Sequence, residues 1–244
     1  MSEERGQLEE FRADLERVLC IVAHPDDIEY GTSAAVARWT AAGATVTYFL
    51  LTSGEAGIDT MAPAEAGPLR EDEERASAEA VGVSEVDFAG YRDGAVVYSL
   101  DLRRDIAREI RRRRPQLVTT LTHAERFPNG FPNQADHRAV GLATLDAIAD
   151  AGNRWIFPEL VDEGFEPWHV RYLAVTAAAT PTHYVDVTET FEAAVASLEE
   201  HRAYLAALPE DYPSPRTLLT GFLGPAGQAV GVDYALPLEV LDRG

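Results

Sequence analysis

One imidazole and three carboxylates follow an apolar run near the start of the chain with almost no spacer. Residues 18–23 read Val-Leu-Cys-Ile-Val-Ala, and His24, Asp26, Asp27 and Glu29 come directly after them. A catalytic divalent ion takes neutral imidazole nitrogen and carboxylate oxygen from a rigid support and keeps one position open for water. His24 and Asp27 are therefore candidate metal ligands.

Pro25 shapes the turn that carries these side chains. It fixes its own φ and disfavours helical backbone at His24, so the chain must turn as it leaves the apolar run. Such a turn can direct His24 and Asp27 at one point and leave Asp26 beside them, where a carboxylate can take a proton from water. The alternative interpretation is an acidic turn that only caps the next helix, because Asp is a good N-cap.

Composition limits the class of protein. The chain has 244 residues and no Pro/Gly/Ser-rich linker, so we expect one domain over residues 1–244. A net charge of −20 argues against binding to the phosphate backbone of nucleic acid. The single Cys20 excludes a disulfide framework, and no run approaches the roughly 20 apolar residues of a membrane span. A soluble, cytoplasmic protein is the expectation.

Hydrophobic patterning predicts alternating helices and strands. We expect strands at residues 18–23, 44–52, 85–89, 117–122, 170–177 and 184–187, and helices at 3–16, 31–42, 69–81, 100–114, 136–151 and 189–208. Strands joined by helices form parallel βαβ units with right-handed crossovers. The predicted fold is α/β, a Rossmann-like three-layer sandwich with a mostly parallel sheet of order 3-2-1-4-5. Residues 209–244 are expected to form a tail that shapes the pocket or contacts another subunit.

This topology brings a second motif to the first. Parallel sheets keep their sites at the carboxyl ends of strands, where the strand order reverses. The first and fourth strands are neighbours at that point, and the fourth leads into the loop before Asp136 and His137. We therefore expect His137 to be the third metal ligand. The alternative is a surface histidine that follows an Asp N-cap.

Several short motifs occur together in one order along the chain. They are Ala-His-Pro-Asp-Asp-Ile-Glu at residues 23–29, Leu-Thr-Ser-Gly-Glu-Ala-Gly at 51–57, Leu-Arg-Glu at 69–71, Asp-Gly at 93–94 and Asp-His-Arg at 136–138. In these motifs the chain resembles the LmbE-like, or PIG-L, N-acetylglucosaminyl deacetylase family, and the strand near residue 185 and the helix bearing His201 extend the likeness. The resemblance implies a zinc-dependent amidase that removes an acetyl group from a small N-acetylated sugar or glycoconjugate, and it leaves a homo-oligomer open.

The resemblance also implies roles for single residues. His24, Asp27 and His137 correspond to the metal ligands, and Asp26 corresponds to the general base. Arg70 and Asp93 correspond to substrate contacts, although the patterning alone makes Arg70 a helix-face charge and Asp93 a turn former. Glu29 and Arg138 are expected to support the loops that carry the ligands.

One position departs from the family pattern. The second motif is usually His-x-Asp-His, and this chain has Gln134 at its first position. Gln can donate a hydrogen bond to an oxyanion, but it cannot donate a proton at neutral pH. We expect Gln134 to act as such a donor with His183 assisting, His123 being the other candidate acid. Asp136 is either part of the catalytic group or only a helix cap.

Two other functions stay open. One is a different metal-dependent hydrolase on the same scaffold, acting on a non-sugar amide or a phosphoester, because a fold does not determine a substrate. The other is a weakly active family member that binds sugar, which the Gln134 substitution motivates.

Overall fold

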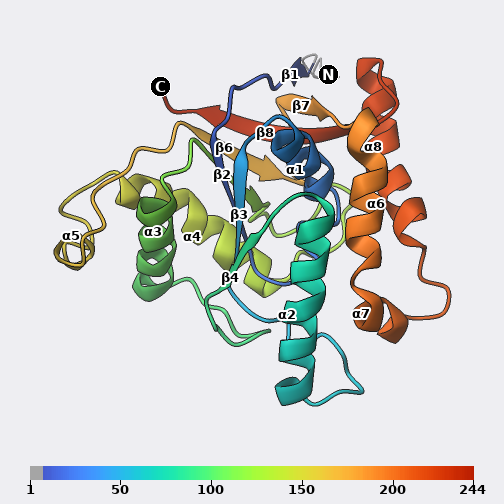
Figure 1. Cartoon of the computed structure of the whole chain (residues 1–244), viewed down its shortest axis with the longest axis horizontal. Helices are drawn as coiled ribbons and strands as arrows, with labels where there is room; N and C mark the ends of the chain where they lie inside the picture. The colour runs from blue at the N-terminus through green and yellow to red at the C-terminus, as the bar shows by residue number, and fades with distance from the viewer. Residues whose placement is uncertain (1–7) are drawn as a thin grey trace.

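The computed structural model describes residues 8–244, which form one eight-stranded sheet between two layers of helices (Figure 1). Five parallel strands are adjacent in the order β4-β3-β2-β5-β6, and the sheet continues as β8-β7-β1. The strands are β1 (Glu9–Glu10), β2 (Arg17–Val22), β3 (Thr45–Leu50), β4 (Glu85–Phe88), β5 (Leu117–Leu121), β6 (Tyr172–Thr176), β7 (His183–Asp186) and β8 (Ala235–Asp242). The α/β class is confirmed, and β2 and β5 are neighbours at the reversal of strand order.

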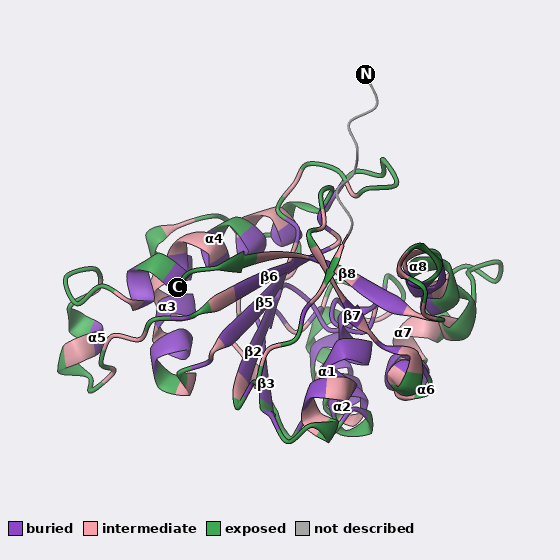
Figure 2. Ribbon diagram, turned by 90° about the horizontal axis from the view of Figure 1, so that it is seen from above, coloured by how far each residue is buried: buried purple, intermediate pink, exposed green. Residues whose placement is uncertain are grey.

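Helices cover both faces of the sheet (Figure 2). One layer contains α1 (Thr32–Ala41), α2 (Pro63–Ala80), α6 (Phe191–Glu199), α7 (Arg202–Ala207) and α8 (Pro215–Val230). The other contains α3 (Leu100–Arg113) and α4 (Ala135–Ala151), with the short α5 (Glu159–Asp162) at its margin, and the turn η1 (Thr188–Thr190) leads into α6. None of the helices in residues 8–244 is long and apolar enough to cross a bilayer.

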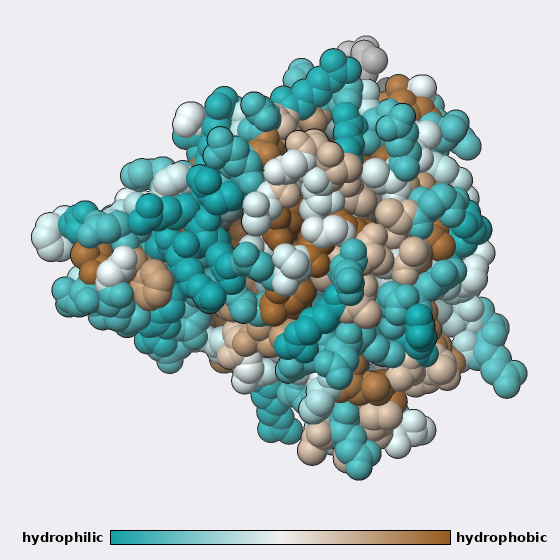
Figure 3. Space-filling view, in the orientation of Figure 1, coloured by the Kyte–Doolittle hydropathy of each residue, from teal (hydrophilic) through white to brown (hydrophobic). Residues whose placement is uncertain are grey.

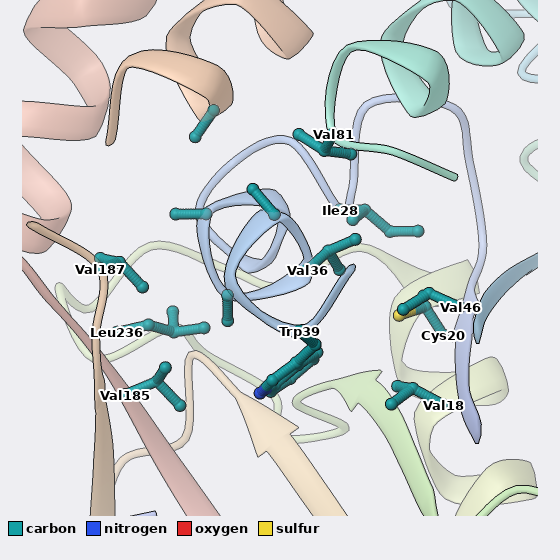
Figure 4. Packing of buried hydrophobic residues seen from close by; sticks show 14 of the residues in the cluster. Val18, Cys20, Ile28, Val36, Trp39, Val46, Val81, Val185, Val187 and Leu236 are labelled. Atoms are coloured by element: carbon teal, nitrogen blue, oxygen red, sulfur yellow. The ribbon is translucent and has the colours of Figure 1, made fainter. Parts of the chain in front are cut away.

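The central strands are apolar on both faces because each face is covered. Alternate side chains of a strand point to opposite sides. Val18 and Cys20 of β2 therefore pack with α1 in one core, whereas Leu19 and Ile21 pack with α3 and α4 in the other. Figure 4 shows the first core, in which Trp39 and Val36 of α1 lie among residues of the sheet and of the flanking segments.

Polar side chains cover much of the outer surface. On the face seen in Figure 3, apolar side chains gather over the middle, whereas the end that bears α5 is mostly hydrophilic with a few apolar side chains among the polar ones. This distribution suits a sheet whose two apolar faces are both buried by helices.

Three sequence expectations about elements are wrong. Residues 209–244 are not a tail outside the fold, because they contain α8 and β8, and β8 pairs antiparallel with both β6 and β7; their expected role at the pocket or at a subunit contact stays a prediction. Residues 8–16 are not helical; β1 lies there, and residues 3–7 fall outside the described part of the chain. The single helix expected at 189–208 is divided into η1, α6 and α7, with His201 at the break between α6 and α7.

Candidate active site

The carboxyl end of β2 turns back on itself and fixes the carboxylate of Asp27. Its Oδ2 accepts hydrogen bonds from the main-chain N–H of Ala23 at 3.1 Å and of His24 at 2.9 Å. These two bonds hold Oδ2 against the end of the strand. The other oxygen, Oδ1, lies 2.9 Å from Nε2 of His137.

His137 lies in the first turn of α4, where Asn133 sets its tautomer. The Nδ2 group of Asn133 donates to the carbonyl oxygens of Thr122 at 2.8 Å and Ala124 at 2.9 Å. Its Oδ1 is therefore the atom that faces Nδ1 of His137 at 2.9 Å, and that nitrogen must carry the proton. The lone pair of Nε2 is left to face Asp27.

His24 is oriented from the opposite side of its ring. Its Nε2 lies 3.1 Å from Oδ1 of Asp93 and 3.4 Å from Oδ2 of Asp136, so this nitrogen is the donor. Asp136 is itself fixed, because its two oxygens accept the main-chain N–H groups of Gly94 and Val96. Nδ1 of His24 is left facing the site.

The two free ring nitrogens and the carboxylate converge. Nδ1 of His24 lies 3.2 Å from Nε2 of His137 and 3.6 Å from Oδ2 of Asp27, and all three side chains are buried. Lone pairs and a carboxylate directed at one point repel each other unless a cation lies among them. One oxygen and two nitrogens, each ring held by a partner on its far nitrogen, fit a divalent ion such as zinc.

The electrostatics of the site agree with this fit. Burial by itself lowers the pKa of His24, but its contacts with Asp136, Asp27 and Asp93 outweigh burial and raise the pKa to about 12. Burial by itself raises the pKa of Asp27, but the charge and hydrogen bond of His137 lower it well below the usual range. The carboxylates around the two rings thus favour positive charge at their centre, whether a proton or a metal ion supplies it.

Asp26 has a different environment from Asp27. Burial raises its pKa to about 6, and the charge of Asp27 adds to this effect while the guanidinium of Arg70, at 3.4 Å, opposes it. The pKa of Asp26 is thus raised and the pKa of Asp27 lowered. Such a difference between adjacent carboxyl groups is typical of sites in which one carboxylate stays ionised and the other transfers protons. Asp26 also has a φ of 91°, a left-handed conformation that is uncommon outside glycine.

Arg70 lies beneath this turn and not on an open surface. It is 3 % exposed, and its two terminal nitrogens donate to the carbonyl oxygens of Gly54 at 2.9 Å and Pro25 at 2.6 Å. A side chain at Gly54 or Gly57 would overlap its guanidinium. The structure thus gives Arg70 a supporting position, and its expected contact with substrate stays a prediction.

Asp93 likewise has contacts within the protein. In addition to His24, it accepts the main-chain N–H of Ala56 at 2.8 Å through Oδ2. It therefore connects the loop after β3 to a candidate ligand. A substrate contact of Asp93 also stays a prediction.

The two residues expected to support the loops contact them. Glu29 is fully buried and accepts the hydroxyl of Ser77 in α2 at 2.8 Å. Arg138 donates to the carbonyl oxygen of Asn133, the residue that orients His137. Glu29 thus joins the first motif to α2, and Arg138 holds the segment before α4.

The candidates for the proton donor lie in three separate places. Gln134 is the N-cap residue of α4, is exposed and makes no capping bond with its side chain. His123 is exposed directly after β5, at the same edge of the sheet. His183 opens β7, three strand spacings of roughly 4.8 Å from β5, with its ring against Phe11 and its Nδ1 facing Thr182. The structure does not bring His183 to the site, so its expected catalytic role is not supported.

The sequence did not predict several residues that hold or orient the candidate site residues. Asn133 lies four positions before His137, a spacing that places two residues near each other at a helix start. Tyr204 of α7 stacks on the guanidinium of Arg70, 4.3 Å from ring centroid to Cζ, and Tyr30 shares a hydrogen bond of 3.1 Å with Tyr212. These tyrosines come from three separate segments, and no local pattern unites them.

The chain is similar to known proteins in sequence and in fold. The sequence profile of the PIG-L family, described as GlcNAc-PI de-N-acetylase, matches residues 19–148, which contain the converging side chains. Diacetylchitobiose deacetylase of Thermococcus kodakarensis is 28 % identical over 200 residues, which cover 81 % of this chain and 72 % of that protein.

Solved structures share the fold. The N,N'-diacetylchitobiose deacetylase of Pyrococcus horikoshii, complexed with its inhibitor MPG, superposes with a TM-score of 0.81 at 25 % identity over 94 % of this chain and 85 % of that one. The 4-carboxy-2-hydroxymuconate hydratase GalB of Pseudomonas putida KT2440 superposes with a TM-score of 0.77 at 18 % identity over 94 % and 97 % of the two chains. The second likeness shows the fold alone.

Proposed function

The chain belongs to the PIG-L family, and on that premise we propose that it is a metal-dependent deacetylase that hydrolyses the N-acetyl group of an amino sugar. The observation that carries the proposal is the convergence of Nδ1 of His24, Nε2 of His137 and the carboxylate of Asp27. The partners of both rings leave those nitrogens free for a metal. We propose zinc as the ion, because two imidazoles and one carboxylate form a common open site for it.

The reaction needs a nucleophile and a proton carrier. An ion held by His24, Asp27 and His137 would polarise the amide carbonyl and make water more acidic. Asp26 then accepts the proton of the attacking water as the new C–O bond forms. With a pKa of about 6, Asp26 is a carboxylate at neutral pH and can also hold the proton once it has been transferred.

The leaving nitrogen must receive a proton when the C–N bond breaks. Gln134 cannot supply it, and His183 lies three strands away. We therefore propose that Asp26 returns the proton it has taken, so that acetate and a free amine are released. Gln134, exposed at the start of α4, is left as a neutral hydrogen-bond donor to the developing oxyanion.

The test is acetate release from an N-acetylated amino sugar by protein loaded with zinc. Diacetylchitobiose and N-acetylglucosamine are suitable first substrates, and a phosphoester panel is the matched control. Acetate release without phosphoester cleavage supports the proposal. Phosphoester cleavage without acetate release contradicts it, because the same site would then serve another hydrolysis.

The presence of Gln134 supports a second candidate function, in which the protein binds the sugar and hydrolyses it only slowly. Single-turnover measurements with protein in excess distinguish the two. A deacetylase completes a single turnover within about a second, since enzyme turnover numbers are about 1–10³ s⁻¹. A sugar-binding protein retains the acetylated sugar.

A further inference from the structure

A second polar cluster lies behind the turn that carries Asp26. Glu29, Glu74 of α2 and His201 are all fully buried, and Nε2 of His201 lies 3.6 Å from each carboxylate. A distance of 3.6 Å is too long for a hydrogen bond, so His201 interacts with the two carboxyl groups through electrostatics and packing. Fully buried charged groups are rare in proteins, because each must be paired to offset its loss of hydration.

The cluster does not share the features of the metal site. His24 and His137 each have a partner on the ring nitrogen that faces away from the site, as metal-bound histidines usually do. His201 has no hydrogen-bond partner on either nitrogen among the described residues. Glu29, Glu74 and His201 lie close enough together to share an ion, but His201 lacks the outer partner that orients a metal-bound histidine.

The contact of this cluster with Asp26 is through the main chain. Oε2 of Glu74 accepts the N–H of Asp26 at 3.3 Å, and both residues are buried. Asp26 is also the residue with a φ of 91°. A left-handed conformation of a non-glycine residue persists only where surrounding contacts hold it, and Glu74 supplies such a contact at the residue itself.

Helix packing explains how Glu74 is held. Arg70, Glu73, Glu74 and Ser77 occupy one buried face of α2 at the i, i+3, i+4, i+7 spacing, although such a face is usually apolar. Glu73 accepts the main-chain N–H of Ala203 and so fixes the start of α7, beside the break that carries His201. The break between α6 and α7 therefore places the histidine against Glu74.

We propose that Glu74 and His201 are positioning residues for Asp26. Glu74 accepts the N–H of Asp26 and holds that residue in its left-handed conformation, and His201 keeps Glu74 in place from its position between Glu74 and Glu29. This inference rests on the proposed function, in which Asp26 is the group that carries the proton.

The protonation of the cluster agrees with this arrangement. Burial raises the pKa of Glu74 well above its usual range, and the neighbouring Glu29 adds to the effect. Burial alone lowers the pKa of His201, but the contact with Glu29 outweighs it and raises the pKa. The raised pKa of His201 favours its charged form, and the raised pKa of Glu74 favours its neutral form. A neutral Glu74 still accepts the N–H of Asp26, a role that a glutamine can fill.

Two uncharged variants of similar volume separate the acceptor from the rest of the side chain. Glu74→Gln keeps an oxygen for the N–H of Asp26, whereas Glu74→Met removes it. We expect Glu74→Met to lower kcat roughly 10- to 100-fold with KM within about twofold, as a base misplaced by about 1 Å would do. Glu74→Gln should stay within about threefold of the unsubstituted enzyme. Both variants should keep one equivalent of zinc.

A double-mutant cycle tests whether the effect passes through Asp26. If it does, Glu74→Met should cost little in an Asp26→Asn background, because the group it positions no longer acts. A crystal structure of Glu74→Met tests the inference without any activity measurement. We expect residue 26 to leave the positive-φ region in that structure. Retention of φ near 90° in Glu74→Met would overturn the inference even if the protein had no deacetylase activity.

Other results would also overturn it. These are equal kcat for the Met and Gln variants, full additivity of Glu74→Met with Asp26→Asn, or a second equivalent of zinc that Glu74→Met removes. Absence of acetate release by the unsubstituted enzyme would instead contradict the proposed function and leave the structural readout to decide the positioning role. Circular dichroism and the melting temperature verify that both variants are folded.

Discussion

In each candidate ligand, hydrogen bonds from neighbouring residues determine which atom faces the metal site. Asn133 places a proton on Nδ1 of His137, Asp93 and Asp136 place one on Nε2 of His24, and two main-chain amides hold Oδ2 of Asp27. The donors are thus fixed before an ion arrives. Such pre-orientation is expected of a metal site, since outer partners set tautomer and ring orientation.

Loss of one ligand tests the assignment. His137→Ala leaves one imidazole and one carboxylate, and two protein ligands rarely hold a catalytic ion. We expect a loss of metal affinity of at least roughly 100-fold. Elemental analysis of protein dialysed against a metal buffer measures it, with His183→Ala as a control that should keep its zinc. Full occupancy in His137→Ala would contradict the assignment.

Asp26 should act in the reaction and not in metal retention. Asp26→Asn preserves the shape of the side chain but cannot accept the proton, so we expect kcat to fall by roughly 10² or more. Zinc content, measured on the same sample, should not change. A zinc-loaded Asp26→Asn protein with the original kcat would show that another group carries the proton.

The sequence predicted which side chains lie together at the candidate site, and the residues it missed have a physical explanation. His24, Asp26, Asp27 and His137 follow from residue type, spacing and the reversal of strand order. Asn133 was missed because its role depends on two carbonyl groups of the loop after β5. His183 was misplaced because a sequence does not reveal how many strands lie between two loops.

The loop after β3 and helix α2 form one structural unit around Arg70. Gly54 has a φ of +62°, and a Cβ there would overlap the guanidinium that supports the turn of Asp26. Gly90 has a comparable φ of +76°, but open space surrounds it. Replacing either glycine with alanine would therefore strain the left-handed backbone, but only at Gly54 would the new Cβ also clash with Arg70.

This difference yields a matched prediction. Gly54→Ala should reduce the free energy of unfolding by about 1–3 kcal/mol more than Gly90→Ala, because overpacking adds to the shared backbone strain. Chemical denaturation of both variants measures the difference. Equal losses in the two proteins would show that Arg70 moves aside at no cost.

Two elements escaped prediction for reasons of packing. Phe11 and Leu15 have helical spacing, but the chain there is not helical, and both side chains enter the core beside β1 and β7. The helix expected at 189–208 has a continuous apolar pattern, yet it breaks where His201 reaches the buried carboxylates of Glu29 and Glu74. In both cases tertiary contacts override a local preference.

The C-terminal strand completes the molecule. β8 lies between β6 and β7, so its backbone pairs on both sides, and Leu236 and Leu238 are buried. Pro237 within it made a central strand improbable from sequence, because proline cannot donate to a ladder. The C-terminal part of the expected tail, β8, is thus an interior strand of the sheet.

Removal of this strand should prevent folding. A chain that ends before Ala235 loses two strand pairings and leaves one edge each of β6 and β7 unpaired and open to association. We expect it to lack a cooperative thermal transition and to be degraded rapidly by protease. A chain ending at residue 242 is the control. Cooperative melting of the shorter chain near the temperature of the control would contradict a central place for β8.

Metal-dependent release of acetate requires the whole fold, because β2, β5 and α4 must be in place before His24, Asp27 and His137 converge. Protein stripped with a chelator, and the same protein reloaded with zinc, are incubated with diacetylchitobiose, and acetate and free amine are measured together. We predict equal amounts of both products from the reloaded protein and none above background from the stripped protein. Acetate release that is the same with and without metal, or its absence from fully loaded and folded protein on every N-acetylated amino sugar offered, would contradict the account.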